Sequence, residues 1–114
     1  MIKLKWRIYE EFDEFRFDET LSDINSGVYA IWSNYEKNII PLYTGQGNIK
    51  QRLYHHNSQT DFGDHFPLSV AWANTFDMNG IERFLYNTLN PKITKASPRV
   101  TPIPVNLPTY LNWG

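Results

Sequence analysis

The sequence predicts an α+β fold in which a small, mainly antiparallel sheet of three or slightly more strands is flanked by helices. Short runs rich in β-branched and aromatic residues are bounded by turn-forming residues, as is typical of strands. Two later stretches instead repeat apolar residues at the spacing of one helix face. The length of 114 residues fits one domain with a modest core.

The first 26 residues contain a possible strand and an acidic segment. The run KLKWRIYEEF, residues 3–12, alternates in part between apolar and polar residues and favours an edge strand. Residues 10–23 hold seven acids and one base, which indicates a solvated loop or a short helix.

Residues 27–32 (GVYAIW) and 38–45 (NIIPLYTG) form a predicted β-hairpin around a polar turn. Strands joined by a turn are antiparallel neighbours, so the phenols of Tyr29 and Tyr43 can lie on one face. Pro41 lacks a backbone donor, so we expect it at a sheet edge or at a bulge.

A helix is predicted over residues 49–57, after Gly45-Gln46-Gly47 breaks the second strand. Asn48 is of a residue type that caps helix N-termini, and Ile49 and Leu53 would face inward one turn apart. Residues 58–66 are a predicted polar loop.

A third strand is predicted over residues 68–76 (LSVAWANTF), and a second helix begins after Asp77 or Asn79. Pro91 stops that helix. Residues 27–91 thus form the predicted core of the domain, which follows the N-terminal part (1–26). The proline-rich residues 92–114 are expected to be an extended tail that lies along the body, with Trp113 suggesting that it docks.

Composition narrows the class of protein. The chain has no cysteine, which excludes disulfides, thiolate metal sites and a cysteine nucleophile. No run approaches the ~20 apolar residues of a membrane span, and the N-terminus does not have the pattern of an export leader. We therefore expect an intracellular protein without a membrane partner.

The net charge of −1 argues against strong non-specific binding to nucleic acid, but the charge is unevenly distributed. Residues 1–9 carry +3, residues 10–23 carry −6 and residues 24–114 carry +2. From Arg83 to the end there are four bases and no acid. The predicted core is therefore mildly basic, although few phosphates can be neutralised.

Two tyrosines, Tyr29 and Tyr43, together with Arg52, His56 and Glu82, are candidates for a site that cuts phosphodiester bonds. Arg52 and His56 are four residues apart and so share one helix face. A guanidinium binds phosphate through two parallel hydrogen bonds, and a single carboxylate suits Mg²⁺ or Mn²⁺. Each residue also has an ordinary structural interpretation: packed strand tyrosines, a solvated arginine and a helix-surface glutamate.

These residues resemble the motifs of the GIY-YIG nuclease family over about residues 27–91. Gly27-Val28-Tyr29 corresponds to GIY and Tyr43-Thr44-Gly45 to YIG. Arg52 and His56 match the family's helix arginine and histidine, and Glu82 matches the helix glutamate that holds the metal. The resemblance implies a DNA endonuclease that hydrolyses phosphodiester bonds with one Mg²⁺ or Mn²⁺ ion, with Tyr29 as the base.

The chain departs from the family pattern in three places. Thirteen residues separate the two tyrosines, which lengthens the turn, and the interval from the second motif to Arg52 is one residue short. The family's late asparagine has no direct match, because Thr94 stands where many members have it. Asn106 is our first candidate for that role, and Asn90 is the alternative.

Four residues are predicted to contact the substrate. Gly45 and Gln46, with Gly47, allow a sharp turn that could bring the backbone close to a phosphate, and Lys50 and Lys92 complete the predicted substrate-binding residues. His55, His56 and His65 could instead bind zinc, but adjacent helix histidines diverge and no cysteine supports them.

DNA is the expected partner, RNA stays open, and a homodimer would allow double-strand cuts. Two other interpretations remain open at this point. The chain could be a weakly active or inactive module that binds nucleic acid or protein, or a nuclease subunit that needs a partner. The weak overall charge and the acidic residues 10–23 motivate the second of these.

Overall fold

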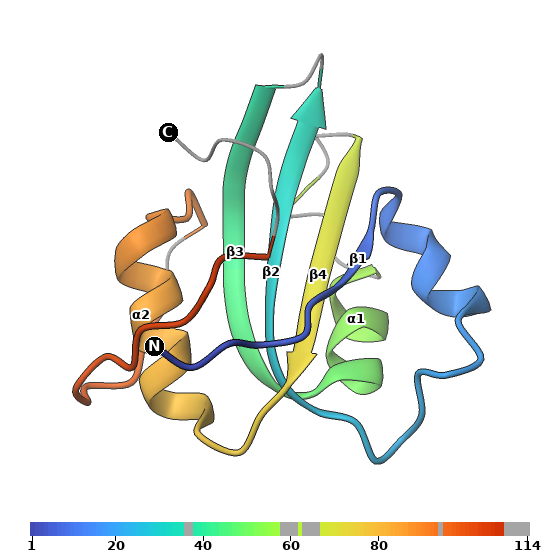
Figure 1. Cartoon of the computed structure of the whole chain (residues 1–114). Coiled ribbons are helices and arrows are strands. Elements are labelled where there is room, and N and C mark those ends of the chain that lie inside the picture. The colour runs from blue at the N-terminus through green and yellow to red at the C-terminus, as the bar shows by residue number, and fades with distance from the viewer. Residues whose placement is uncertain (36–37, 58–61, 63–66, 94, 109–114) are drawn as a thin grey trace.

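The computed structural model describes residues 1–35, 38–57, 62, 67–93 and 95–108, and it forms an α+β fold (Figure 1). The sheet is antiparallel and has four strands in the order β1-β4-β2-β3, one more than the three runs that the sequence predicts with most weight. In chain order the elements are β1 (Arg7–Tyr9), the 3-10 helix η1 (Phe12–Phe17), β2 (Ser26–Tyr35), β3 (Asn38–Asn48), α1 (Ile49–Asn57), β4 (Leu68–Asn74) and α2 (Met78–Leu89).

The core has two parts, one on each face of the sheet. Alternate residues of a strand point to opposite faces, and β2 uses both. Its Tyr29 and Ile31 pack with residues of α1 and η1, whereas Val28 and Ala30 pack with α2 and with Val105. Accordingly, Figure 1 shows α1 and α2 on either side of the sheet.

The predicted hairpin is β2 with β3, and its register places the two phenols on one face. The prediction that Gly45-Gln46-Gly47 breaks the second strand is wrong, because these residues continue to pair with β2 and β3 extends to Asn48. Tyr29 pairs with Gly45 and Tyr43 pairs with Ile31, so Tyr43 is the diagonal neighbour of Tyr29. The expectation for Pro41 is confirmed, because the register shifts beside it and β3 is an edge strand. The bulge leaves the carbonyl of Pro41 free to accept a hydrogen bond of 3.1 Å from the backbone N–H of Lys92.

Helix α1 has the predicted bounds, and Asn48 is its cap: the Asn48 Oδ1 accepts a hydrogen bond of 3.0 Å from the backbone N–H of Gln51. Helix α2 begins one residue after Asp77, so the alternative cap, Asn79, lies inside the first turn. The helix ends at Leu89, before Pro91, as predicted.

The N-terminal part agrees with its prediction in part. β1 is an edge strand but covers only three residues of the predicted run 3–12, and η1 is a short helix within the acidic residues. The predicted extended tail, residues 92–114, can be compared with the structure only in part, because residues 109–114, including Trp113, lie outside the described residues. In the described part, Val105 is buried and forms an isolated bridge with Ile2. No helix in the described ranges is long and apolar enough to cross a bilayer.

Candidate functional site

A cavity of about 370 Å³ collects six of the predicted site residues at the edge of the sheet. Strands β2 and β3 and helices α1 and α2 supply six of its lining residues, and the chain after α2 supplies the other four. The lining residues are Tyr29, Tyr43, Gly45, Gln46, Arg52, Glu82, Lys95, Ala96, Ser97 and Pro98. The spatial condition for a joint site, phenols beside a guanidinium and a carboxylate, is therefore met.

The two tyrosines and His56 form a packed aromatic group at one end of this cavity. The rings of Tyr29 and Tyr43 are stacked, with centroids 6.1 Å apart and planes inclined by 20°. The Tyr29 hydroxyl and His56 Nε2 share a hydrogen bond of 2.6 Å. His56 also contacts the edge of the Tyr43 ring at 4.5 Å between centroids. Helix α1 thus fixes the orientation of Tyr29 through the residue one turn after Arg52.

Gly45 makes room for the Tyr29 ring. It stands directly opposite Tyr29 in the register, and a Cβ atom at this position would collide with the Tyr29 hydroxyl. The glycine of the second motif is therefore required by the packing of the tyrosine of the first motif, whatever the function of the site.

Burial sets the protonation state of Tyr29. The side chain is buried, and this burial, followed by the neighbouring phenol of Tyr43, raises the pKa of Tyr29 well above its ordinary value. The charge of Arg52 lowers that pKa, whereas the charge of Glu82 raises it. Tyr29 is therefore a neutral phenol near pH 7, and it needs a proton acceptor of its own before it can take a proton from water.

The raised pKa of Tyr29 has a consequence for stability at high pH. Burial and a hydrogen bond to Asp18 also raise the pKa of Tyr9. Above about pH 10 the unfolded chain loses protons that the folded chain keeps, so the free energy of unfolding should fall as the pH rises. We expect a slope of up to about 1.4 kcal/mol per pH unit for each phenol.

Urea unfolding at several pH values between 8 and 11 would measure this slope. The Tyr29→Phe variant should show about half of it, whereas Tyr54→Phe, at an exposed position, should keep all of it. A wild-type stability that stays constant across this range would contradict the burial of these phenols.

Glu82 is a buried carboxylate, with 1 % of its surface exposed, so the interpretation of a helix-surface glutamate is wrong. Its Oε2 accepts a hydrogen bond of 2.7 Å from Gln46 Nε2, which also donates to Asn79 Oδ1 at 2.7 Å. Its Oε1 forms an ion pair with the ammonium of Lys95. The Lys95 ammonium in turn lies 5.3 Å from the centroid of the Tyr43 ring. The carboxylate and the aromatic group are thus linked through one lysine.

Arg52 is exposed to solvent on the cavity side of α1. Its guanidinium lies close to Gly47, whose φ of 128° favours glycine. Within the described residues it forms no ion pair. The planar fork is therefore available for an anion that enters the cavity.

Four predicted residues do not line this cavity. His56 is buried and contacts the tyrosines that line it, and the other three are Lys50, Lys92 and Asn106. Lys50 lies 3.9 Å from a carboxylate oxygen of Asp23, and Lys92 is at the outer edge of β3, where its backbone bonds to Pro41. Asn106 Oδ1 accepts a hydrogen bond of 2.6 Å from the backbone N–H of Leu4, and its Nδ2 donates to the carbonyl of Leu4 at 3.0 Å.

Among the described residues, the alternatives for the late asparagine and for the zinc site do not line this cavity either. Asn90 is an exposed left-handed residue at the end of α2, away from the cavity wall. Thr94 and His65 lie outside the described residues. The late asparagine therefore has no counterpart among the residues that line the cavity, because the N-terminal segment engages the amide of Asn106.

The structure instead predicts a structural role for Asn106. Replacing it with alanine removes two hydrogen bonds and leaves the backbone of Leu4 unpaired, so we expect a loss of about 1–3 kcal/mol in the free energy of unfolding. Urea unfolding measures that loss. Any activity of the folded protein should stay within about twofold of wild type, as the cavity does not contain this side chain. A variant of full stability and lost activity would contradict this assignment.

Lys95 and Ser97 belong to the cavity but are absent from the sequence-based candidates. The sequence signal for Lys95 was the basic, acid-free stretch after Arg83, because a cation in this stretch has no acidic neighbour there and can pair with an acid from another segment. The sequence does not show which acid Lys95 pairs with, because that depends on the path of the chain after Pro91.

The side chains around Glu82 can be compared with the ligands that the predicted Mg²⁺ or Mn²⁺ ion needs. No group of three or more His, Asp or Glu residues that could hold a metal ion occurs in the described ranges. A single carboxylate with bound water is nevertheless a common arrangement for Mg²⁺, and the Lys95 ammonium against Glu82 Oε1 indicates that a positive charge fits there. The residues therefore fit one hard divalent cation that takes the position of the ammonium.

Comparison of the chain with protein-family models, with curated proteins and with solved structures finds no match.

Proposed function

We propose that this protein is a metal-dependent endonuclease that hydrolyses DNA phosphodiester bonds by a GIY-YIG type of mechanism. One observation carries the proposal: the two phenols, Arg52 and the buried carboxylate of Glu82 line a single cavity. A packed core has no need of this combination, because burial of a carboxylate beside two phenols costs free energy.

The scissile phosphate would lie in this cavity. Arg52 supplies a fork for two phosphate oxygens and stabilises the charge that develops on them. The hydroxyl of Tyr43 can donate a further hydrogen bond. The ammonium of Lys95 would also be available to the phosphate if a bound cation neutralised Glu82 in its place.

Tyr29 and His56 would activate the attacking water together. The neutral phenol takes the proton of the water while its own proton passes to His56 Nε2, 2.6 Å away. The water oxygen bonds to phosphorus, and the bond from phosphorus to the leaving sugar oxygen breaks. That oxygen takes a proton from a second water molecule, and the hydroxide left behind is neutralised by the proton that His56 received. The imidazole thus accepts the phenol proton, which the raised pKa of Tyr29 otherwise keeps on the hydroxyl near pH 7.

Glu82 would hold one Mg²⁺ or Mn²⁺ ion, with water molecules and the substrate phosphate supplying its other oxygen ligands. The ion would contribute charge neutralisation at the phosphate. Gln46 orients the carboxylate, because it bonds to Glu82 and Asn79 at the same time.

A panel of labelled substrates tests the proposal. Single-stranded, duplex and branched DNA, with matched RNA, are incubated with Mg²⁺, Mn²⁺ or EDTA, and the products are separated on denaturing gels. We expect new 3′ and 5′ ends from DNA only in the presence of the metal. Intact substrates under all conditions, at protein concentrations that bind DNA, would reject the endonuclease.

A second candidate function is a non-catalytic nucleic-acid-binding module. The ion pair between Lys95 and Glu82 favours it, because the carboxylate that would hold the cation is already neutralised. In that case DNA would be retained in a gel-shift assay with Mg²⁺ and recovered uncut.

A further inference from the structure

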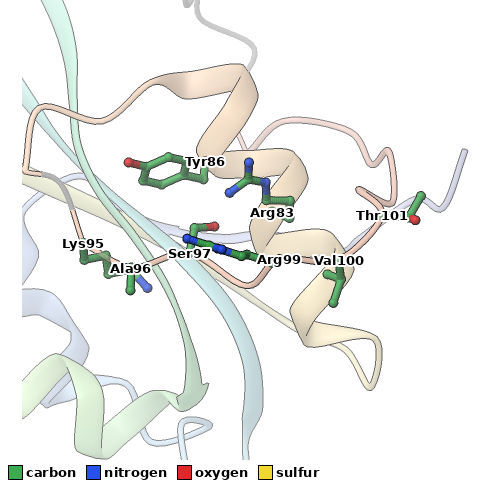
Figure 2. Close-up of a pocket in the computed structure, with 8 residues that line it drawn as sticks. All are labelled: Arg83, Tyr86, Lys95, Ala96, Ser97, Arg99, Val100 and Thr101. Carbon is green, nitrogen blue, oxygen red and sulfur yellow. The ribbon is translucent and has the colours of Figure 1, made fainter.

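A second and larger cavity, of about 790 Å³, lies between α2 and the chain that follows it (Figure 2). Figure 2 shows Arg83 and Tyr86, from α2, facing the segment that carries Ser97 and Arg99. This cavity and the one at Glu82 share three lining residues, Lys95, Ala96 and Ser97. The two cavities are therefore neighbours separated by one short stretch of chain.

The second cavity is strongly basic. Arg83 and Arg99 form no ion pair within the described part of the chain, and the wall contains no acid. Lys95 is neutralised by Glu82, so two uncompensated guanidinium groups remain. The Ser97 Oγ is buried and has no hydrogen-bond partner among the described residues. Two cations and an unused hydroxyl are the groups that bind a phosphate.

The cavity also offers an aromatic surface. The Tyr86 ring lines the wall, with the Arg83 guanidinium 6.0 Å from its centroid. Aromatic and guanidinium planes together hold unpaired bases by stacking, which a duplex does not permit. The volume lies in the range of small-ligand sites and has room for one nucleotide.

We propose that this cavity binds a nucleotide next to the scissile phosphate in a single-stranded segment of DNA. Arg83, Arg99 and the Ser97 hydroxyl hold its phosphate, and Tyr86 stacks on its base. The position relative to the cut rests on the proposed function, whereas binding by the cavity does not. Such a site would give the protein a preference for single-stranded or splayed substrates, despite its net charge of −1.

Fluorescence anisotropy with a fluorescein-labelled, single-stranded 12-mer in EDTA tests the proposal. The variant Arg83→Gln/Arg99→Gln should bind roughly tenfold or more weakly, and its plot of log K against log salt should be shallower by about 0.7. The control Lys3→Gln/Lys5→Gln removes the same charge from two exposed positions and should stay within about twofold of wild type. Far-UV circular dichroism confirms that both variants fold.

Other arms separate the sources of the phosphate. Inorganic phosphate or a mononucleotide, added at the concentration of the labelled 12-mer, should not displace it, because the strand also occupies the first cavity. Displacement by either small molecule would overturn the strand-binding site and indicate a site for a free nucleotide. A duplex 12-mer that binds as tightly as the single strand would overturn the stacking of an unpaired base.

The two proposals fail differently. Three results would overturn the nucleotide site. The arginine variant could bind the 12-mer as tightly as wild type, both double variants could lose the same affinity, or wild type could fail to bind at all. If the arginine variant alone loses binding but no metal supports cleavage, the nucleotide site stands and the endonuclease fails.

Discussion

The Tyr29→Phe variant should cleave DNA about 10²- to 10⁴-fold more slowly than wild type at saturating metal. The substitution removes only the hydroxyl that the water would use, whereas the ring keeps its stacking on Tyr43 and its place in the core. The lost hydrogen bond to His56 should cost about 1–2 kcal/mol of stability, which leaves a folded protein for the assay.

Two measurements separate a chemical role of Tyr29 from a structural one. Binding of the labelled 12-mer in EDTA should match wild type, because Arg52 and the basic cavity are unchanged. The control is Tyr54→Phe, which removes a hydroxyl from an exposed position of α1 outside the site cavity and should leave cleavage unaltered. Full cleavage by Tyr29→Phe would show that this phenol is a packing residue and that the base lies elsewhere.

The hairpin that positions Tyr29 was predictable because its determinants are local. Alternation within β2, and the lack of a donor at Pro41, decide which side chains share a face. The Asn48 cap likewise fixes where α1 begins, and hence that Arg52 and His56 point the same way. A short-range pattern therefore accounts for one half of the site.

The other half depends on contacts between distant segments, which no local pattern reveals. Helical spacing places Glu82 next to the apolar stripe of α2, yet its burial requires Gln46 from β3 and Lys95 from the chain after Pro91. Asn106 shows the same limit in reverse: its position after the last helix suggested a role in the site, but Leu4, 102 residues away, takes both ends of its amide.

The Glu82→Gln variant should lose cleavage by about 10³-fold or more, because one neutral amide cannot hold a hard divalent cation at the phosphate. The amide keeps the size of the side chain, and Lys95 is exposed enough to turn its ammonium towards solvent. Stability should therefore change little. Glu19→Gln removes the same charge from an exposed position and should cleave like wild type. Cleavage by Glu82→Gln within about tenfold of wild type would exclude Glu82 as the metal residue.

Lys95→Gln tests the same ion pair from the other side. Without the ammonium, the buried Glu82 carboxylate lacks a positive partner, so we expect a loss of about 1–3 kcal/mol in metal-free buffer. Mg²⁺ or Mn²⁺ should restore stability, by about 2.7 kcal/mol at a hundredfold excess over its dissociation constant. Thermal or urea unfolding with and without the metal measures this gain. The double variant Lys95→Gln/Glu82→Gln should not gain, and if it is stabilised equally, the cation binds somewhere other than Glu82.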